Sequence, residues 1–471
     1  MVGAGNAGLS AAHAARERGA RVTVLEKASR AWSGGNSAFT AGAMRFAHGG
    51  LDDLGDLLEP DERHADTELD PYTADEFLAD MRRVTLGRGD EAMARILVGD
   101  SGDAVRWLHG RGIRFRLMYE RQAYEQDGRH RFWGGLAVGA VDGGAGLVAQ
   151  HRAAAERTGI EVRDESPVSD LVPGGVIVRG EELRADAVIL TAGGFESNPQ
   201  MRAAYLGPNW DVAKVRGTPH NTGEVLRAAL ARGAQAYGNW SGCHAIQWDA
   251  GAPPTGDLEL TNRYSRQSYP LGIVVNADGH RFLDEGADFR NYTYAKYGAE
   301  VLRQPQAVAH QLFDARTAGM LRTIDYEAPG ATRVDADTIA ELAERLGIDA
   351  ARLVRTVAEY NAAVQPGEFD PSVKDGKRTQ GIDPPKSNWA LPLEQPPFTA
   401  FPVTCGITFT FGGLRVDERA RVLDEAGAPM PGLFAAGELV GGLFFHNYPG
   451  GSGLTAGTVW GRRAGYAAAD L

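Results

Sequence analysis

The stretch that decides the fold is Gly3-Ala4-Gly5-Asn6-Ala7-Gly8, which opens the chain and runs directly into the alanine-rich segment 9–18. Its glycines have the spacing of a dinucleotide-binding turn: Gly3 permits a tight turn, Gly5 lets the backbone approach a pyrophosphate, and Gly8 lets a helix pack against a sheet. The N-terminus of that helix offers N–H groups and the positive end of the helix dipole to the phosphates. The pattern alone is weak evidence, since the chain contains 61 glycines.

The residues that follow supply the context that such a turn requires. Arg21-Val22-Thr23-Val24-Leu25-Glu26 alternates as a strand does and ends in an acid. Glu26 lies 18 residues after Gly8, where the carboxylate that binds a ribose hydroxyl is expected. A second glycine-rich turn, Ser33-Gly34-Gly35-Asn36-Ser37, comes soon afterwards. It favours FAD over a nicotinamide dinucleotide, because FAD needs close backbone approach along its whole length.

The first strand of the dinucleotide fold is short in this sequence. The dinucleotide fold places a buried strand before the first glycine, and only Met1 and Val2 precede Gly3. We therefore expect a truncated first strand: either the true start lies further upstream, or the domain lacks its central strand.

Composition bounds the class of protein. The 471 residues are 43% hydrophobic and 23% charged, which is ordinary for a globular protein of two domains or of one domain with an insertion. The formal net charge of −12 argues against nucleic acid and anionic membrane surfaces as partners. Two distant cysteines, Cys243 and Cys405, indicate reduced thiols in a cytoplasmic protein. No apolar run is long enough for a membrane span, so no direct membrane insertion is expected.

Later segments again have the pattern of the start of the chain, in which strands alternate with glycine-rich turns and a helix. Residues 185–195 read as a buried strand entering Ala192-Gly193-Gly194, and 431–438 as a strand ending in Gly437-Glu438. Residues 448–454 open a helix that reaches residue 469. We expect an α/β fold with a Rossmann-like FAD-binding domain over 1–238 and 406–471.

The residues between these segments lack that pattern and predict other elements. Residues 274–282 predict a hairpin around an Asp-Gly turn, 338–346 and 349–360 a helix pair, and 366–402, with eight prolines, an irregular connection. We expect them to form an inserted α+β capping domain over 239–405.

The residues expected to bind the cofactor come from all the glycine-rich segments of the first domain. They are Gly3, Gly5, Asn6, Ala7, Gly8, Glu26, Lys27, Gly34, Gly35, Asn36, Ser37, Ala192, Gly193, Gly194, Gly437, Glu438, Gly453 and Leu454.

Taken in order, these motifs resemble the fumarate reductase and succinate dehydrogenase flavoprotein family over almost the whole chain. Within the family, segments 240–244, 284–294 and 404–413 are most similar to the tricarballylate dehydrogenases. That resemblance implies oxidation of a tricarboxylate to cis-aconitate with FAD, and transfer of the electrons to a separate iron–sulfur partner. Two cysteines are too few for a cluster of the chain's own, which agrees with this.

Several positions depart from the family pattern. Thr408 and Phe409 stand where fumarate reductases have a histidine pair, and Tyr448 stands where they have a substrate arginine. The proton-relay Glu and Arg map approximately to Ser265 and Ser268. Fumarate reduction is therefore not expected. The histidine that carries flavin covalently in succinate dehydrogenase is absent around residues 36–37, so the resemblance implies non-covalent FAD.

Three residues are expected to act on the substrate. The resemblance aligns Arg290 with the family's catalytic arginine and His244 with a substrate-binding histidine. The resting pKa of an arginine is too high for an efficient base, so Glu285 or Asp288 would have to relay the proton. Tyr448 resembles a tyrosine of ketosteroid dehydrogenases that supports an enolate.

The sequence thus predicts an FAD-dependent dehydrogenase that removes two hydrogens from adjacent carbons of a small polycarboxylate. A separate electron-acceptor protein is the expected partner. Two alternatives stay open: a ketosteroid-type dehydrogenase acting beside a carbonyl group, and a non-catalytic flavin-binding protein.

Overall fold

Two long strands, β14 (Ala236–Asp249) and β18 (Phe398–Leu414), carry the chain between two compact units. The computed structural model describes residues 1–132 and 134–471, and for Gln126 the backbone only. Unit 1 comprises Met1–Asp211, Gly217–His244 and Thr408–Leu471; unit 2 comprises Val212–Arg216 and Ala245–Ile407. These units are defined by packing alone, and the division at 238/239 and 405/406 into cofactor and capping domains stays a prediction.

Unit 1 is built on a parallel layer that residues 1–3 complete. Strand β1 (Thr23–Leu25) pairs in parallel with β8 (Glu161–Arg163), and β12 (Val188–Leu190) pairs in parallel with β20 (Pro429–Ala435). Strand β19 (Arg421–Leu423) pairs with β20 in antiparallel orientation. Val2 bridges in parallel to both Leu25 and Leu190. The short segment 1–3 therefore occupies the centre of the layer.

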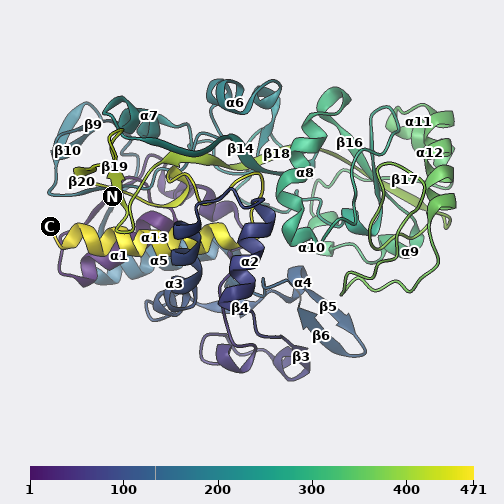
Figure 1. Ribbon diagram of the computed structural model, residues 1–471, viewed down its shortest axis with the longest axis horizontal. Helices are drawn as coiled ribbons and strands as arrows, with labels where there is room; N and C mark the ends of the chain where they lie inside the picture. The colour runs from purple at the N-terminus through teal and green to yellow at the C-terminus, as the bar shows by residue number, and fades with distance from the viewer. Residues whose placement is uncertain (133) are drawn as a thin grey trace. The chain divides into compact units, whose positions relative to one another are not determined.

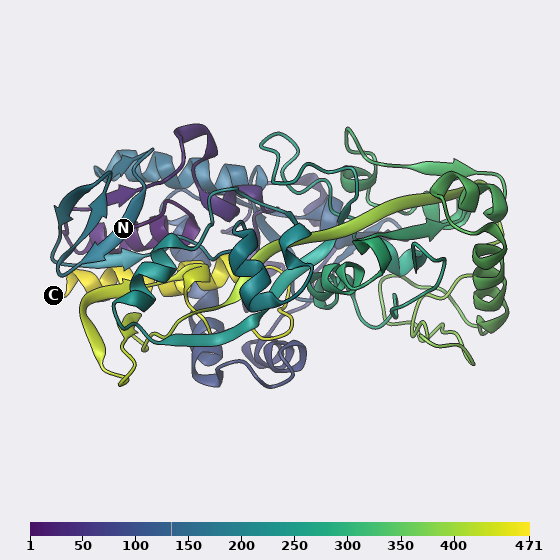
Figure 2. The same cartoon turned by 90° about the horizontal axis from the view of Figure 1, so that it is seen from above.

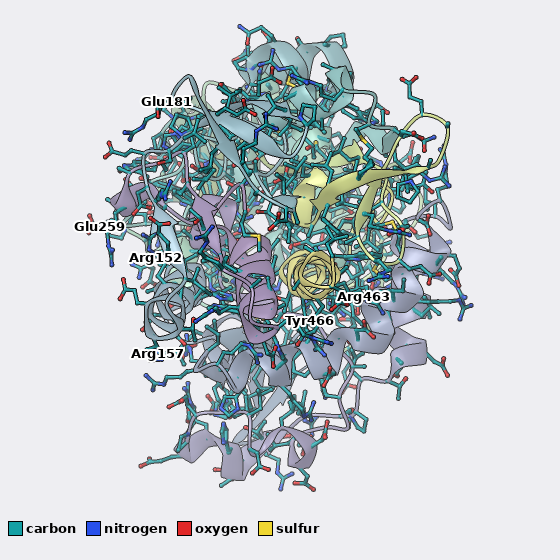
Figure 3. All side chains as sticks on the ribbon, turned by 90° about the vertical axis from the view of Figure 1, so that its left-hand side faces the viewer. Arg152, Arg157, Glu181, Glu259, Arg463 and Tyr466 are labelled. Atoms are coloured by element: carbon teal, nitrogen blue, oxygen red, sulfur yellow. The ribbon has the colours of Figure 1, made fainter. Side chains whose placement is uncertain are left out.

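Two helices with small residues on their facing sides pack against each other in unit 1. Helix α1 (Asn6–Glu17) begins directly after Gly5, and α13 (Ser452–Ala469) ends the chain; Figure 3 looks along α13 and shows α1 beside it. A Cβ added to Gly461 would lie 2.4 Å from the carbonyl oxygen of Ala7, and one added to Gly465 would lie 2.2 Å from that of Ala11. Their four-residue spacing puts both glycines on one face of α13, which allows the backbones this close approach.

A buried asparagine ties α1 to its neighbours. Asn6 is 1% exposed. Its Nδ2 donates to the carbonyl oxygen of Leu454 (2.8 Å) and to Oγ1 of Thr458 (3.1 Å), while its Oδ1 lies 3.0 Å from Nε2 of His151 on α5 (Gly143–Thr158). One side chain therefore links the first, fifth and last helices.

The other elements of unit 1 surround this layer (Figure 1). They are β2 (Ala43–Met44), β3 (Thr67–Glu68), α2 (Ala74–Val84), α3 (Glu91–His109), β4 (Phe115–Leu117), α4 (Tyr119–Gln122), β5 (Ala123–Gln126), β6 (Arg129–Phe132), β7 (Val138–Ala140), β9 (Val168–Val172), β10 (Gly175–Val178), β11 (Glu181–Arg184), α6 (Pro199–Leu206) and α7 (Glu224–Ala231). None of the helices in the described part of the chain has both the length and the apolar character needed to cross a membrane.

Unit 2 is a mixed sheet with short helices. Its strands run in the order β13 (Lys214–Val215), β18, β16 (Ala309–Phe313), β15 (Ile273–Asn276), with β14 and β17 (Val334–Ala336) also paired to β18. Figure 2 shows β18 as one long ribbon. The remaining helices are α8 (Tyr294–Leu302), α9 (Ala315–Ala318), α10 (Thr323–Tyr326), α11 (Ile339–Leu346) and α12 (Ala350–Ala363).

The predicted helix pair of unit 2 is present, and a side chain caps the start of each helix. The side chain of Thr338 accepts from the N–H of Glu341 at the start of α11, and that of Asp349 accepts from the N–H of Arg352 at the start of α12. Leu342 on α11 and Leu353 on α12 are both fully buried in the core that joins the two helices to the sheet.

Two sequence expectations for unit 2 were wrong in part. Residues 274–282 do turn at Asp278-Gly279, but the returning arm keeps only one bridge, Val275 to Arg281, because β15 takes β16 as its partner. The irregular connection predicted for 366–402 ends at 397, where β18 begins. Phe398 and Ala400 are buried in the core of the unit, and this burial outweighs the strand-breaking tendency of Pro402.

Replacing Asn6 should destabilise the apoprotein. Asn6→Ala leaves the buried partners on α5 and α13 without their hydrogen bonds, which costs about 1–3 kcal/mol in the free energy of unfolding. Chemical unfolding followed by circular dichroism measures it. Gln200→Ala, at an exposed position of α6, is the control and should change stability by less than about 0.5 kcal/mol. An unchanged Asn6→Ala curve would contradict the structural role of Asn6.

Candidate flavin and substrate site

The glycine-rich turn before α1 has two enclosed glycines and one open one. Gly3 has φ +105°, and a Cβ there would lie 2.5 Å from the carbonyl oxygen of Thr191. A Cβ on Gly8 would lie 2.0 Å from the carbonyl oxygen of Gly3. A Cβ on Gly5 would meet nothing closer than 3.4 Å. Gly5 is also the N-cap of α1 and has no side chain of its own to cap the helix. The Oγ of Ser37 accepts from the first N–H of α1, that of Asn6, and the other N–H groups of the first turn remain suited to an anionic ligand.

Glu26 binds the backbone of the glycine-rich turn through its side chain. Its side chain is buried, its Oε2 accepts from the N–H of Ala4 (2.9 Å), and its Oε1 accepts from the N–H of Ala28 (2.8 Å). Burial raises the pKa of this carboxyl. Because each carboxylate oxygen can accept more than one hydrogen bond, Glu26 keeps capacity for a ribose hydroxyl.

The next residue, Lys27, is directed to another part of the unit. Its Nζ donates to Oγ1 of Thr222 (2.7 Å) and forms an ion pair with Glu224 (2.8 Å). The carbonyl oxygen of His220 also lies 3.3 Å from Nζ. Lys27 therefore ties the end of β1 to the start of α7.

The second glycine-rich turn is joined to the first. Gly34 and Gly35 lead into the 3-10 helix Gly35–Phe39, and the Oγ of Ser37 accepts from the N–H of Asn6 (3.0 Å). Asn36 donates through Nδ2 to Oε1 of Glu196 (2.6 Å) and to the carbonyl oxygen of Thr408, and its Oδ1 accepts from the N–H of Thr218 (2.9 Å).

The later glycine motifs lie against the same residues. A Cβ on Gly193 would lie 2.4 Å from Nδ2 of Asn221, and one on Gly194 would lie 2.2 Å from Oε1 of Glu438. Gly437 lies against Ala7 on α1, where a Cβ would come within 2.8 Å. The hydrogen bonds and close contacts described here join all the glycine-rich segments predicted to bind FAD within unit 1.

This donor and acceptor set fits an FAD molecule. An open helix N-terminus suits its pyrophosphate, buried acids with free lone pairs suit its hydroxyls, and backbone without side chains suits close approach. Asn6 and Lys27 were also predicted to bind the cofactor, but in the structure their side chains bind other parts of the protein.

Four residues of this network were missed from the sequence. Glu196 follows the Gly193-Gly194 pair closely enough to have been considered, whereas Thr218, Asn221 and Thr410 lie in segments without a glycine signature. Only the folded chain brings these last three residues to the predicted flavin cradle, which consists of the glycine-rich segments together with Glu26, Glu196 and Glu438.

An aromatic cluster lies at the edge of the same unit. The ring of His244 is stacked on Phe409 (5.2 Å between centroids, 14°) and meets Tyr448 edge-on (4.8 Å, 77°). Phe444 packs edge-on against both Phe409 (5.8 Å) and Tyr448 (5.4 Å). The Cα of Gly453 faces Tyr448 and Phe409, since a Cβ there would lie 3.9 and 4.0 Å from them.

This cluster, defined as His244, Phe409, Phe444 and Tyr448, is a buried surface of rings with two polar ends. His244 is 0% exposed and Tyr448 is 7% exposed. The rings can pack on an apolar or planar group, while the phenol and the imidazole can serve a carbonyl or carboxylate. Two of the three predicted catalytic residues are thus in direct contact.

The third, Arg290, belongs to unit 2. It is 7% exposed and begins the 3-10 helix Arg290–Tyr292. Burial raises the pKa of the Tyr269 phenol, the positive charge of Arg290 lowers it, and the negative charge of Asp288 raises it. The hydroxyl of Tyr269 lies 2.6 Å from Oγ1 of Thr293.

The two acids suggested as proton relays differ. Glu285 is 0% exposed and accepts from Nε of Arg281 (3.0 Å) and from the N–H of Val274 (2.8 Å). Asp288 accepts from the N–H of Phe289 (2.8 Å) and lies 3.6 Å from Nζ of Lys374. Glu285 is therefore committed to a structural ion pair, which leaves Asp288 as the candidate for the relay.

Comparison with known proteins places the chain. Residues 1–454 match the family described as FAD binding domain, and the chain belongs to that family, the fumarate reductase/succinate dehydrogenase flavoproteins. It is 29% identical to a probable fumarate reductase of Shewanella frigidimarina, over 99% of this chain and 73% of that protein. It is 29% identical to 4-oxocyclohexanecarboxylate 2-dehydrogenase of Sinomonas cyclohexanicum, over 99% of this chain and 93% of that protein.

A solved structure agrees with this assignment. The open conformation of a flavocytochrome c3 fumarate reductase is 29% identical, has a TM-score of 0.73, and is matched by 100% of this chain over 77% of its own. The predicted family and its α/β FAD-binding fold are confirmed. The protein is an FAD-dependent oxidoreductase acting on CH–CH groups, which sets aside the non-catalytic alternative.

A methyl group added at Gly5 should weaken FAD binding without lowering the stability of the apoprotein. The backbone of Gly5 (φ −73°, ψ 179°) suits any residue, and an added Cβ makes only ordinary contacts with the protein. Gly5→Ala should therefore melt like wild-type apoprotein but bind FAD about 10- to 100-fold more weakly, the cost of overpacking by one methyl group. Fluorescence titration with FAD measures it.

Gly8→Ala is the matched comparison for that experiment. Its Cβ would collide with the carbonyl oxygen of Gly3, so it should lower the melting temperature of the apoprotein. FAD binding by Gly5→Ala at wild-type affinity would show that the pyrophosphate does not approach this turn.

Proposed function

We propose that the protein uses non-covalently bound FAD to desaturate adjacent carbons of a small polycarboxylate, in the manner of tricarballylate to cis-aconitate. The observation that supports this direction over fumarate reduction is the aromatic cluster. Phe409 and Tyr448, which stand where fumarate reductases have substrate-binding polar groups, are packed together against His244. Rings at those two positions cannot pair with the carboxylates of fumarate as a histidine and an arginine can, which favours a different substrate.

Each residue then has a distinct task. FAD, when bound, supplies the acceptor for the hydride. We assign the proton lost from the adjacent carbon to Arg290, which accepts it as one of its own N–H protons passes to the Asp288 carboxylate. His244 and Tyr448 orient the substrate. Since the net charge of −12 repels a polycarboxylate, fixed cationic or donor groups are required to hold it.

A separate protein is the proposed electron acceptor. The chain has two cysteines, fewer than the four thiolates that hold an iron–sulfur cluster. Within the part of the chain that the structure describes, no group of three or more His, Cys, Asp and Glu residues is arranged to hold a metal ion. Electrons therefore have to leave the flavin for a partner molecule.

A second function is favoured by Tyr448. A phenol at the end of a ring-lined surface can donate to a ketone oxygen and stabilise an enolate, as in a ketosteroid-type dehydrogenation. The relative from Sinomonas cyclohexanicum is named for a substrate with a ring, a ketone and a carboxylate. Desaturation beside a carbonyl group is therefore the competing proposal.

Arg290→Lys should slow flavin reduction while FAD stays bound. Lysine keeps the charge but loses the planar fork of donors, which is not conservative at a proton-transfer site. We expect the rate of anaerobic flavin bleaching to fall by at least about 100-fold, the lower end of general acid–base contributions. Stopped-flow absorbance measures it. Arg303→Lys, at an exposed position in the same unit, should bleach at the wild-type rate; so would Arg290→Lys if the proton role lies elsewhere.

Tyr448→Phe separates the two substrate classes. Wild-type enzyme is mixed anaerobically with tricarballylate, a 4-oxocyclohexanecarboxylate and a 3-ketosteroid. The polycarboxylate proposal expects bleaching by tricarballylate, and less than about 10-fold loss in Tyr448→Phe, which removes one hydrogen bond to the substrate. Bleaching by ketones alone, with a loss above about 100-fold in Tyr448→Phe, would replace the first proposal by the second.

A further inference from the structure

Two carboxyl groups meet inside the predicted flavin cradle. Glu196 follows the Gly193-Gly194 turn and is 0% exposed; Glu438 lies in the 3-10 helix Gly437–Leu439 and is partly exposed. The two carboxyl groups lie close enough for one to donate a hydrogen bond to the other. Ionised carboxylates are acceptors only and repel each other. The contact therefore requires a proton on one of the two.

The surrounding donors identify which acid carries the proton. Oε1 of Glu196 accepts from Nδ2 of Asn36 and from Nδ2 of Asn221, both at 2.6 Å. Oε2 of Glu196 is buried and, among the described residues, receives no hydrogen bond from any donor group. That pattern suits a neutral acid, with Oε1 as the carbonyl oxygen and Oε2–H as the donor.

The partner acid has the surroundings of an anion. Oε1 of Glu438 accepts from the N–H of Thr410 (2.8 Å) and from its hydroxyl (3.3 Å), and the N–H of Gly194 also donates to this carboxylate. Burial and the neighbouring negative charge raise the pKa of Glu196 well above its usual range. Burial also raises the pKa of Glu438, but hydrogen bonds from Glu196 and from backbone N–H groups lower it, so Glu438 is the acid of the pair that ionises first.

One cation packs near the pair. Arg202 on α6 donates to the backbone carbonyl oxygens of Glu196, Trp210 and Asp211. The other partners of the two acids, Asn36, Asn221 and Thr410, carry no charge.

We propose that Glu196 is a proton-carrying positioning residue for the flavin. As a neutral acid it donates to Glu438, keeps the pair at one negative charge, and fixes the Glu438 carboxylate as an acceptor for a hydroxyl or N–H group of the cofactor. When Glu196 loses its proton at high pH, the pair carries two charges beside a cofactor that is itself anionic. FAD affinity then falls, because like charges in a buried site repel strongly.

The proton can be observed without turnover. Infrared spectra of the apoprotein at neutral pH should show the C=O stretching band of a protonated carboxylic acid. The band should disappear in Glu196→Gln and persist in Glu156→Gln, an exposed acid on α5. Melting temperatures confirm that each variant folds.

Titration with FAD across the pH range tests the consequence. Glu196→Gln keeps an N–H donor for Glu438 and has no proton to lose, so its affinity should stay within about 3-fold of wild type at neutral pH and not fall at high pH. Glu196→Ala loses the donor, and its affinity should fall about 10- to 100-fold, the range for a hydrogen bond to a charged group. Glu156→Gln should follow the wild-type curve.

Three results would overturn the proposal: a carboxylic acid band that survives Glu196→Gln, a wild-type FAD affinity that does not fall at high pH, or an equal fall in Glu196→Gln. Glu438→Gln provides a second variant should Glu196→Gln fail to fold. It should retain the band of Glu196 and lose affinity at neutral pH. Loss of the band in Glu438→Gln would mean that Glu438 carries the proton.

Discussion

The close approach of backbone to backbone at Gly3 and Gly8 is the constraint on which the rest of unit 1 depends. A methyl group on either residue would stand 2.5 Å or less from a carbonyl oxygen. The hydroxyl of Thr191 completes the contact by donating to the carbonyl oxygen of Val2 (2.9 Å). With the turn held between β1 and β12, Gly5 lies beside Gly34 and Ser37 of the second glycine-rich turn, where an added Cβ would make only ordinary contacts. Asn6 and the glycines of α13 then fix the direction of α1 from its other side.

The cradle handles charge in an unusual way for an anion-binding site in an acidic protein. In the proposed complex, helix N–H groups serve the phosphates. The acids of the cradle, Glu26 and Glu438, accept hydrogen bonds from backbone N–H groups. A protonated Glu196 keeps one more negative charge out of the site. Affinity for an anionic cofactor therefore depends on oriented dipoles and on proton occupancy, both of which act over short distances in a buried site.

The sequence predicted the parts of the cradle that carry their own local signature. Glycine spacing predicted the turn at 3–8, the acid at 26, and the family to which the chain belongs. It could not predict Asn221, because a polar residue in a segment without a pattern acquires a role only when the fold brings it to Gly193. It also assigned no role to Thr410 within the family segment 404–413, because the contact of Thr410 with Glu438 appears only in the fold. It misplaced the start of β18, because burial of Phe398 and Ala400 overrides the local effect of proline. It also could not show that Glu285 is committed to Arg281.

The most direct test of the account is a crystal structure of the protein with FAD bound. The account predicts the pyrophosphate against the N-terminus of α1 beside Gly5, a ribose hydroxyl on the Glu26 carboxylate, and the Glu438 carboxylate within hydrogen-bonding distance of the cofactor and of Glu196. FAD bound away from α1, or a Glu438 side chain separated from both the cofactor and Glu196, would contradict it.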